Sequence, residues 1–170
     1  NNVRRILAYS SIAQAGYIAM GFAVVGKAWG DAPVDVLNLG VQQMALLGIA
    51  GALLLVLAHA LMKTGAFIAT AQVAPISPKE SESDPDDISN YAGLISRAPI
   101  TAICMMVLMF ALAGIPPTAG FVGKLVLFAS VYYSGLVWLV VLAILNSALS
   151  LVYYLRIISY MILKEPEGPK

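Results

Sequence analysis

The sequence predicts an all-α, polytopic transmembrane helix bundle with about five spans, one of them a broken helix. Of the 170 residues, 60% are hydrophobic and only 11% are charged, whereas a soluble domain carries roughly 25% charged residues. The apolar residues form long uninterrupted runs, and a spanning helix needs roughly 20 such residues. One run is short and lies between glycine and proline residues, a pattern typical of discontinuous transporter helices.

The first two predicted spans cover residues 6–25 and 41–73, and a short loop carrying Asp31 and Asp35 separates them. At 1.5 Å per residue, the second helix would be ~50 Å long. This exceeds the hydrocarbon core of a bilayer, which is ~30 Å thick. We therefore expect the second helix to tilt, to project beyond the membrane or to unwind locally.

Residues 75–97 form the only extended polar stretch and predict an acidic extramembrane loop. Its acidic residues are Glu80, Glu82, Asp84, Asp86 and Asp87. Acidic side chains are ligands for calcium, but the ordered spacing of a calcium-loop motif is missing. We therefore expect this loop to be solvated.

The remaining apolar segments cover residues 98–113, 120–133 and 136–163. The middle one would be ~21 Å long as a helix, too short for a core of ~30 Å. Glycine and proline residues bracket it, so we expect the broken helix there. Five crossings would divide the basic loop residues almost evenly between the two sides, so the positive-inside rule does not fix the orientation.

We expect residues 1–170 to form a single transmembrane domain that is a piece of a longer membrane protein. The chain opens Asn-Asn-Val-Arg-Arg, without an initiator methionine. Polar residues interrupt the first apolar run, unlike the core of a cleaved leader.

Lys63 and Lys124 are the main functional candidates, because each lies in an apolar segment while all nine carboxylates lie in loops or in the tail. An ionisable group at membrane depth costs at least ~3 kcal/mol and is a functional candidate by default. Burial without a counter-charge favours the neutral amine, so such a lysine can exchange a proton near neutral pH. An arginine cannot do this. The alternative for Lys63 is that its side chain snorkels to the membrane interface.

His59 precedes Lys63 by four residues, so both lie on one face of the second helix. An imidazole and an amine at this spacing can act as neighbouring stations of a proton relay. The alternative is that His59 only bonds a neighbouring helix. We do not expect a metal site, because no further ligands accompany this histidine.

Lys124 follows the sequence Pro-Pro-Thr-Ala-Gly. Unwound backbone at membrane depth is tolerated where it lines a cavity and can hold water or an ion. The alternative is that Lys124 marks the interfacial end of an ordinary helix.

Two polar stripes at helical spacing indicate either a wet interior or helix–helix contacts. They consist of Ser10, Gln14 and Tyr17 in the first span and Asn146, Ser150 and Tyr153 in the last. We expect Arg156, near the end of the last span, to snorkel or to pair with a partner subunit.

Several function classes are excluded by composition. A net charge of +1 is not that of a strongly basic nucleic-acid binder. The single cysteine, Cys104, excludes a disulfide framework or a cysteine-rich metal site. Neither a glycine-rich phosphate loop nor a cluster of metal ligands is present in the sequence. We therefore expect no cofactor in this chain, and any redox chemistry on another polypeptide.

Four stretches resemble antiporter-like membrane subunits of respiratory complex I and its relatives. They are Leu-Ala-Tyr-Ser-Ser-Ile-Ala-Gln-Ala-Gly-Tyr at 7–17, His-Ala-Leu-Met-Lys at 59–63, Leu-Ala-Gly-Ile-Pro-Pro-Thr-Ala-Gly-Phe-Val-Gly-Lys at 112–124, and residues 145–156, from Leu-Asn-Ser to Tyr-Tyr-Leu-Arg. The third and fourth are most similar to the N-type subunit, called subunit 2 in mitochondria. An archaeal deazaflavin-dependent relative of complex I would accommodate both these N-type stretches and the lysine of the second stretch.

The resemblance implies proton translocation by a non-redox subunit of an NADH:quinone-type oxidoreductase, a multi-pass protein of a prokaryotic cell membrane. Electrons would pass from a reduced cofactor to a quinone-like acceptor elsewhere in the complex. Lys124 would be the proton-carrying lysine of a broken helix, with Lys63 and His59 as a central relay. The chain would be the second of two inverted five-helix repeats. The first repeat, with a functional glutamate and another lysine, and further membrane subunits would be its partners.

Two other functions share these features. A subunit of a multi-subunit sodium/proton antiporter or of a membrane-bound hydrogenase has the same fold by resemblance. A structural membrane scaffold with fixed lysines is the second alternative.

Overall fold

The computed structural model describes residues 2–30, 39–73, 84 and 86–165, and these are predominantly helical. The elements are α1 (Val3–Gly30), α2 (Leu39–Val73), the 3-10 helix η2 (Ile88–Tyr91), α3 (Leu94–Arg97), α4 (Pro99–Ala113), α5 (Ala119–Tyr133) and α6 (Val137–Leu163). The predicted all-α, polytopic bundle is confirmed. In the described part of the chain, three helices are long and apolar enough to cross a membrane, within Val3–Ala28, Gln42–Val73 and Val137–Leu163.

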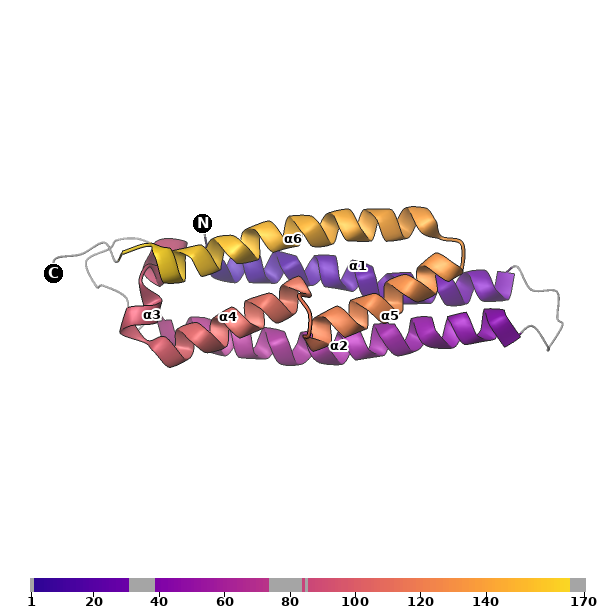
Figure 1. Cartoon of the computed structure of the whole chain (residues 1–170), viewed down its shortest axis with the longest axis horizontal. Coiled ribbons are helices and arrows are strands. Elements are labelled where there is room, and N and C mark those ends of the chain that lie inside the picture. The colour runs from indigo at the N-terminus through magenta and orange to yellow at the C-terminus, as the bar shows by residue number, and fades with distance from the viewer. Residues whose placement is uncertain (1, 31–38, 74–83, 85, 166–170) are drawn as a thin grey trace.

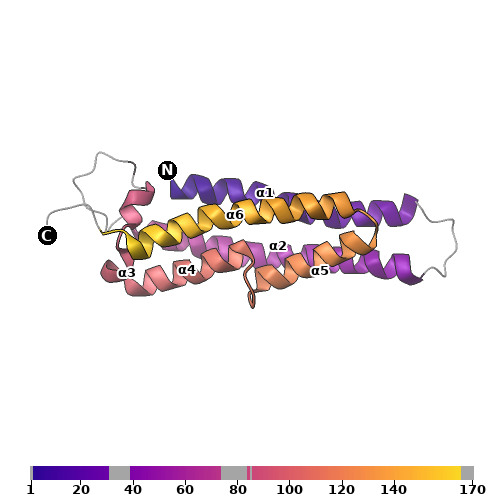
Figure 2. The same cartoon turned by 45° about the horizontal axis from the view of Figure 1, so that its top comes forward.

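The two shorter apolar helices lie end to end. Figures 1 and 2 show α4 and α5 following one another along the length of α2, and both pack against it. Each has 15 residues and is ~22 Å long. Together they form one interrupted rod beside the uninterrupted 35-residue α2. The five predicted apolar segments are therefore arranged as four rods, one of which is broken at its middle.

With four rods in place of five separate crossings, the basic residues are no longer divided evenly between the two ends of the bundle. The first residue of α1, the last of α2, the first of α4 and the last of α6 all lie at one end (Figure 1). Arg4, Arg5, Arg97 and Lys164 lie at or near that end, whereas Lys27 is in the last turn of α1 at the other. From the positive-inside rule we therefore expect the arginine-rich end to face the cytoplasm.

Cysteine labelling tests this orientation. In a Cys104→Ala background, we expect a membrane-impermeant maleimide to label Tyr133→Cys in intact cells and Glu165→Cys only in inverted vesicles. Both positions are exposed and lie near opposite ends. The reverse labelling pattern would contradict the orientation.

The buried apolar side chains form two clusters, one towards each end of the bundle. In α1, Leu7 belongs to one cluster and Tyr17 to the other; in α6, Tyr154 and Val140 are divided in the same way. The polar residues of both helices lie between these positions along the sequence. The fold thus places a polar layer between two apolar clusters, at the level where α4 ends and α5 begins.

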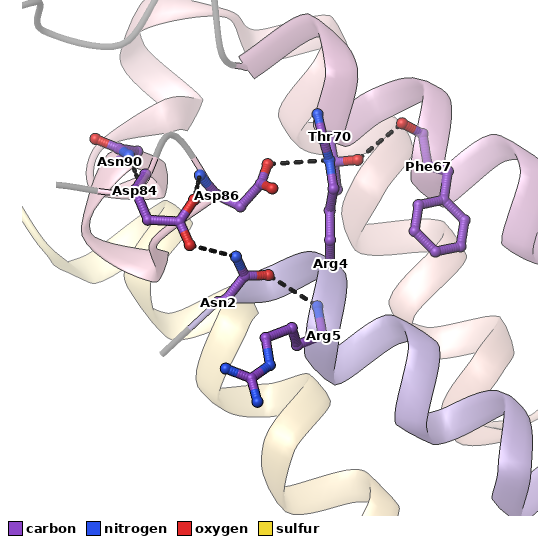
Figure 3. A network of polar contacts seen from close by, with 8 residues as sticks. All are labelled: Asn2, Arg4, Arg5, Phe67, Thr70, Asp84, Asp86 and Asn90. Atoms are coloured by element: carbon purple, nitrogen blue, oxygen red, sulfur yellow. Dashed lines mark hydrogen bonds and ion pairs between the residues drawn. The ribbon is translucent and has the colours of Figure 1, made fainter.

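The described part of the acidic segment is folded against the start of α1 (Figure 3). The guanidinium of Arg4 forms an ion pair with Asp86, with Nε 3.0 Å from Oδ1. The side-chain amide of Asn2 donates to Asp84 at 2.6 Å. The backbone amide of Asp86 and this asparagine hold the pKa of the Asp84 carboxyl below its usual range.

Helices η2 and α3 follow directly, and side-chain hydrogen bonds hold both ends of η2. Asp87 accepts a hydrogen bond from the Ser89 amide at 2.9 Å, which lowers the pKa of this carboxyl. The Arg97 guanidinium donates to the carbonyls of Asn90 and Ala92 at 2.7 and 2.8 Å. These residues are therefore more ordered than a solvated loop. Residues 75–83 and 85 of the predicted loop lie outside the described residues, and its position outside the membrane stays a prediction.

Candidate functional site

The break between α4 and α5 follows from two prolines. In a continuing helix, the carbonyls of Leu112 and Ala113 would accept from residues four positions later, which are Pro116 and Pro117. Proline has no amide hydrogen, so both carbonyls are released. Helix α4 ends instead at Gly114, whose φ of 83° lies in the left-handed region that glycine adopts without strain.

Lys124 fills this break. Its Nζ donates to the carbonyls of Leu112 at 3.3 Å and Ala113 at 3.0 Å, and to Ser147 Oγ of α6 at 3.3 Å. The side chain is 5% exposed, and Nζ lies 5.3 Å from the centroid of the Tyr17 ring. A helix C-terminus carries roughly half a negative charge. The end of α4 therefore stabilises the ammonium where no carboxylate does so among the described residues.

Helices α4 and α5 meet closely at Gly120. A Cβ atom at this position would lie 2.2 Å from the carbonyl oxygen of Ala111, far inside van der Waals contact. A Cβ atom on Gly114 would lie 3.1 Å from Lys124 Nζ. Glycine at these two positions lets the helix ends and the amine approach one another. Lys124 consequently lies near the middle of the bundle, not at the interfacial end of an ordinary helix.

Lys63 is held in the α1–α2 contact. Its Nζ donates to the carbonyl of Leu7 and to the hydroxyl of Ser10, and the side chain is 7% exposed. Lys63 lies ten residues before the end of α2 at Val73, a distance of ~15 Å along the helix. The amine therefore does not snorkel to the end of the bundle.

His59 lies near both amines. It is half-buried, and its position exposes it to the charges of both Lys63 and Lys124. Its Nδ1 is buried and has no hydrogen-bond partner among the described residues. The structure thus brings the three predicted site residues into one electrostatic neighbourhood. Their roles in proton transfer stay predictions.

Both predicted polar stripes face this neighbourhood. Ser10, Gln14 and Tyr17 are all buried on α1. On α6, the Tyr153 hydroxyl donates to Ser150 Oγ at 2.9 Å. Arg156, by contrast, is exposed on α6. The pairing of this arginine with a partner subunit stays a prediction.

Sequence reasoning missed two parts of the site. Ser147 lies next to Asn146 of the predicted stripe but about 100° around the helix, so the spacing pattern skipped it. The carbonyls of Leu112 and Ala113 carry no side-chain signal. The two prolines four residues later were the signal that could have found them.

A groove of about 460 Å³ lies between α5 and α6 beside Lys124. It is lined by the Lys124 side chain, by Ser147 and by the aromatic residues Phe121, Phe128, Tyr132 and Tyr133. Among the described residues, no group of three or more histidine, cysteine or acidic side chains is placed to hold a metal ion. The polar groups around Lys63 and Lys124 are amines, an imidazole and hydroxyls, which can pass protons, and an amide, which forms hydrogen bonds.

Comparisons with known proteins show to which proteins the chain that carries this site is similar. Residues 1–150 match the family model described as NADH:quinone oxidoreductase/Mrp antiporter, transmembrane. The chain is 49% identical over 170 residues to the F(420)H(2) dehydrogenase subunit N of Methanosarcina mazei, which covers 98% of this chain and 31% of that protein. It is 41% identical over 167 residues to the NADH-quinone oxidoreductase subunit N of Trichlorobacter lovleyi, covering 98% and 29%. The chain thus spans about a third of the length of these relatives.

Proposed function

The chain belongs to the NADH:quinone oxidoreductase/Mrp antiporter transmembrane family, and we propose that it is the part of an antiporter-like subunit that moves protons across a membrane. Membership confirms the predicted resemblance, including its N-type character and its archaeal counterpart. The activity, substrates and partners of the whole subunit are part of the proposal, because the chain covers only about a third of its relatives.

One observation carries this proposal: Lys63 and Lys124 are both buried in the middle of the bundle, and all their hydrogen bonds go to neutral oxygens. A carboxylate partner would fix each amine in its charged form. Carbonyls and hydroxyls hold the ammonium more weakly, so that the amine can release its proton and later take up another. His59 supplies an intermediate acceptor between them.

We further propose that the driving reaction takes place on other polypeptides. Two relatives are named as subunits of an F(420)H(2) dehydrogenase and of an NADH-quinone oxidoreductase. In a comparable complex, electrons would pass from a reduced cofactor to a quinone-like acceptor. This chain would contribute the membrane path, packed against the remainder of its own subunit and other membrane subunits.

The family description also includes the Mrp antiporters, so a sodium/proton antiporter is the second candidate function. Sodium is a hard cation that binds oxygen ligands, as calcium and magnesium do. The two ammonium groups disfavour a second cation beside them. Proton movement is therefore the function that the site supports best.

Lys63→Ala tests the proposal in the complete complex, reconstituted in liposomes. We expect proton movement through this subunit to fall by about 10²-fold, the scale of a lost general acid–base group. Lys164→Ala is the matched control, because Lys164 is exposed at the end of α6, and this variant should pump normally. Exchanging sodium for potassium should leave the wild-type rate unchanged. A sodium requirement would favour the antiporter, and normal pumping by Lys63→Ala would favour a scaffold.

A further inference from the structure

A cationic stripe runs along the end of α6. Arg156, Tyr160 and Lys164 follow one another at intervals of four residues, so they lie on one side of the helix end. Arg156 and Lys164 are exposed, and Tyr160 is partly buried. The ammonium of Lys164 lies over the Tyr160 ring, with Nζ 5.1 Å from the ring centroid. Lys164 is therefore folded back onto α6, on the side that carries Arg156.

The depth of this stripe in the membrane follows from the length of α6. Its 27 residues form a helix ~40 Å long, about 10 Å longer than the hydrocarbon core of a bilayer. With the helix centred in the membrane, its last residue, Leu163, lies ~5 Å beyond the core. Arg156 then lies ~5 Å inside the core. Tyr160 lies at the boundary, where aromatic residues are enriched in membrane proteins.

Arg156 needs an anion at this depth. A guanidinium stays protonated in proteins, and a charge in the hydrocarbon region is expensive unless it is paired or reaches the interface. In the described part of the chain, no carboxylate forms an ion pair with Arg156 or Lys164, whereas Arg4 at the same end is paired with Asp86. The stripe therefore presents two cations without a counter-charge, one on each side of the core boundary.

The same face of α6 is apolar below the arginine. Leu149 and Val152 precede Arg156 by seven and four residues, which is the spacing of one helix face, and each is 66% exposed. They continue from the arginine towards the middle of the membrane, the direction in which acyl chains extend. Phosphate fits the cations above them, because guanidinium groups bind it through paired N–H donors and lysine binds it as a point charge. Charge and apolar surface thus follow the order of a phospholipid.

We propose that Arg156 and Lys164 bind the phosphate of an anionic membrane phospholipid such as phosphatidylglycerol, whose acyl chains lie along Val152 and Leu149. Tyr160 keeps the Lys164 ammonium at the site through its ring. We expect this end of the bundle to face the cytoplasm, where anionic lipids give the membrane a negative surface potential. A zwitterionic lipid fits less well, because its own ammonium group would meet the two cations. The inference does not depend on the proposed function, since Arg156 lies on the outer surface of α6.

Lipid retention by the complete complex tests this site. The purified complex is stripped with detergent and supplied with dioleoylphosphatidylglycerol, and the bound lipid is counted by mass spectrometry. We expect Arg156→Gln to weaken binding at this site by about tenfold or more, the scale of a lost hydrogen bond to a charged group. Glutamine is a good helix former, so α6 should persist. Arg5→Gln is the matched control, because it removes one exposed charge from α1 at the same end, and it should retain the lipid.

Further arms of the experiment distinguish a lipid from other anions. Arg156→Lys keeps the charge without the paired donors, so we expect retention between those of the wild type and Arg156→Gln. Dioleoylphosphatidylcholine should not be retained at this site, and inorganic phosphate should not displace phosphatidylglycerol, because it lacks the acyl chains. An electron cryo-microscopy map of the complex should show headgroup density between Arg156 and Lys164.

Four results would overturn the inference. They are equal retention by the wild type and Arg156→Gln, equal retention of the zwitterionic lipid, displacement by inorganic phosphate, and a carboxylate of another subunit beside Arg156 in the map. None of them bears on proton movement through Lys63 and Lys124, which the pumping measurements test separately.

Discussion

Lys124→Ala is expected to abolish proton movement through this subunit while the complex stays assembled. The lysine provides the only amine at the α4–α5 break among the described residues, and it donates to two carbonyls of α4 and to Ser147 of α6. Alanine removes the group that exchanges the proton, so the rate should fall by about 10²-fold or more. Proton uptake by liposomes containing the variant complex, measured during electron transfer, provides the readout.

The assembled state of that variant is checked by its migration in a native gel and by its electron-transfer rate with an uncoupler. Alanine is a good helix former, so α5 should persist. If the variant pumped at the wild-type rate with unchanged coupled electron transfer, Lys124 would be a fixed structural cation.

Gly120→Ala is expected to produce the largest loss of stability among alanine substitutions at the glycines in the described part of the chain. The new Cβ would lie 2.2 Å from the Ala111 carbonyl oxygen, and neither side of this contact is a flexible side chain. Relief requires α4 and α5 to move apart, which should cost at least the ~1–3 kcal/mol typical of overpacking. The same movement draws the carbonyls of Leu112 and Ala113 away from Lys124, so pumping should fall as well.

Gly16→Ala provides the matched control, because a Cβ at Gly16 meets nothing within 4 Å. Within α1 this change should be neutral or stabilising by about 0.5–1 kcal/mol. Thermal unfolding of the two purified variants compares them directly. Equal unfolding temperatures would show that α4 and α5 can move apart at Gly120 without loss of stability.

Most of the fold could be predicted from the sequence, because long apolar runs have few alternatives to helix in a membrane. The predicted second span matched α2 closely, and Gly114, Pro116 and Pro117 marked the break. The end-to-end arrangement of α4 and α5 could not be predicted. A helix of 15 residues is compatible with a separate short span or with half of a broken one, and only its packing on α2 decides between them.

The candidate site was predictable in its titratable groups and less so in their partners. Lys63 and Lys124 were conspicuous because charge is rare in apolar segments. Their acceptors are mainly backbone carbonyls, whose availability depends on where a helix ends. The hydrogen bond from Gln14 to the Leu112 carbonyl likewise depends on how α1 packs beside α4. Side-chain spacing on one helix carries no information about the register with another.

Lys124→Arg tests directly whether the Lys124 amine releases and takes up a proton. Arginine keeps the positive charge and the hydrogen-bond donors for the α4 carbonyls, but it does not release its proton in proteins. We expect an assembled complex whose proton-to-electron ratio falls as far as that of Lys124→Ala. A wild-type ratio in the arginine variant would show that a permanent charge is sufficient and that Lys124 exchanges no proton.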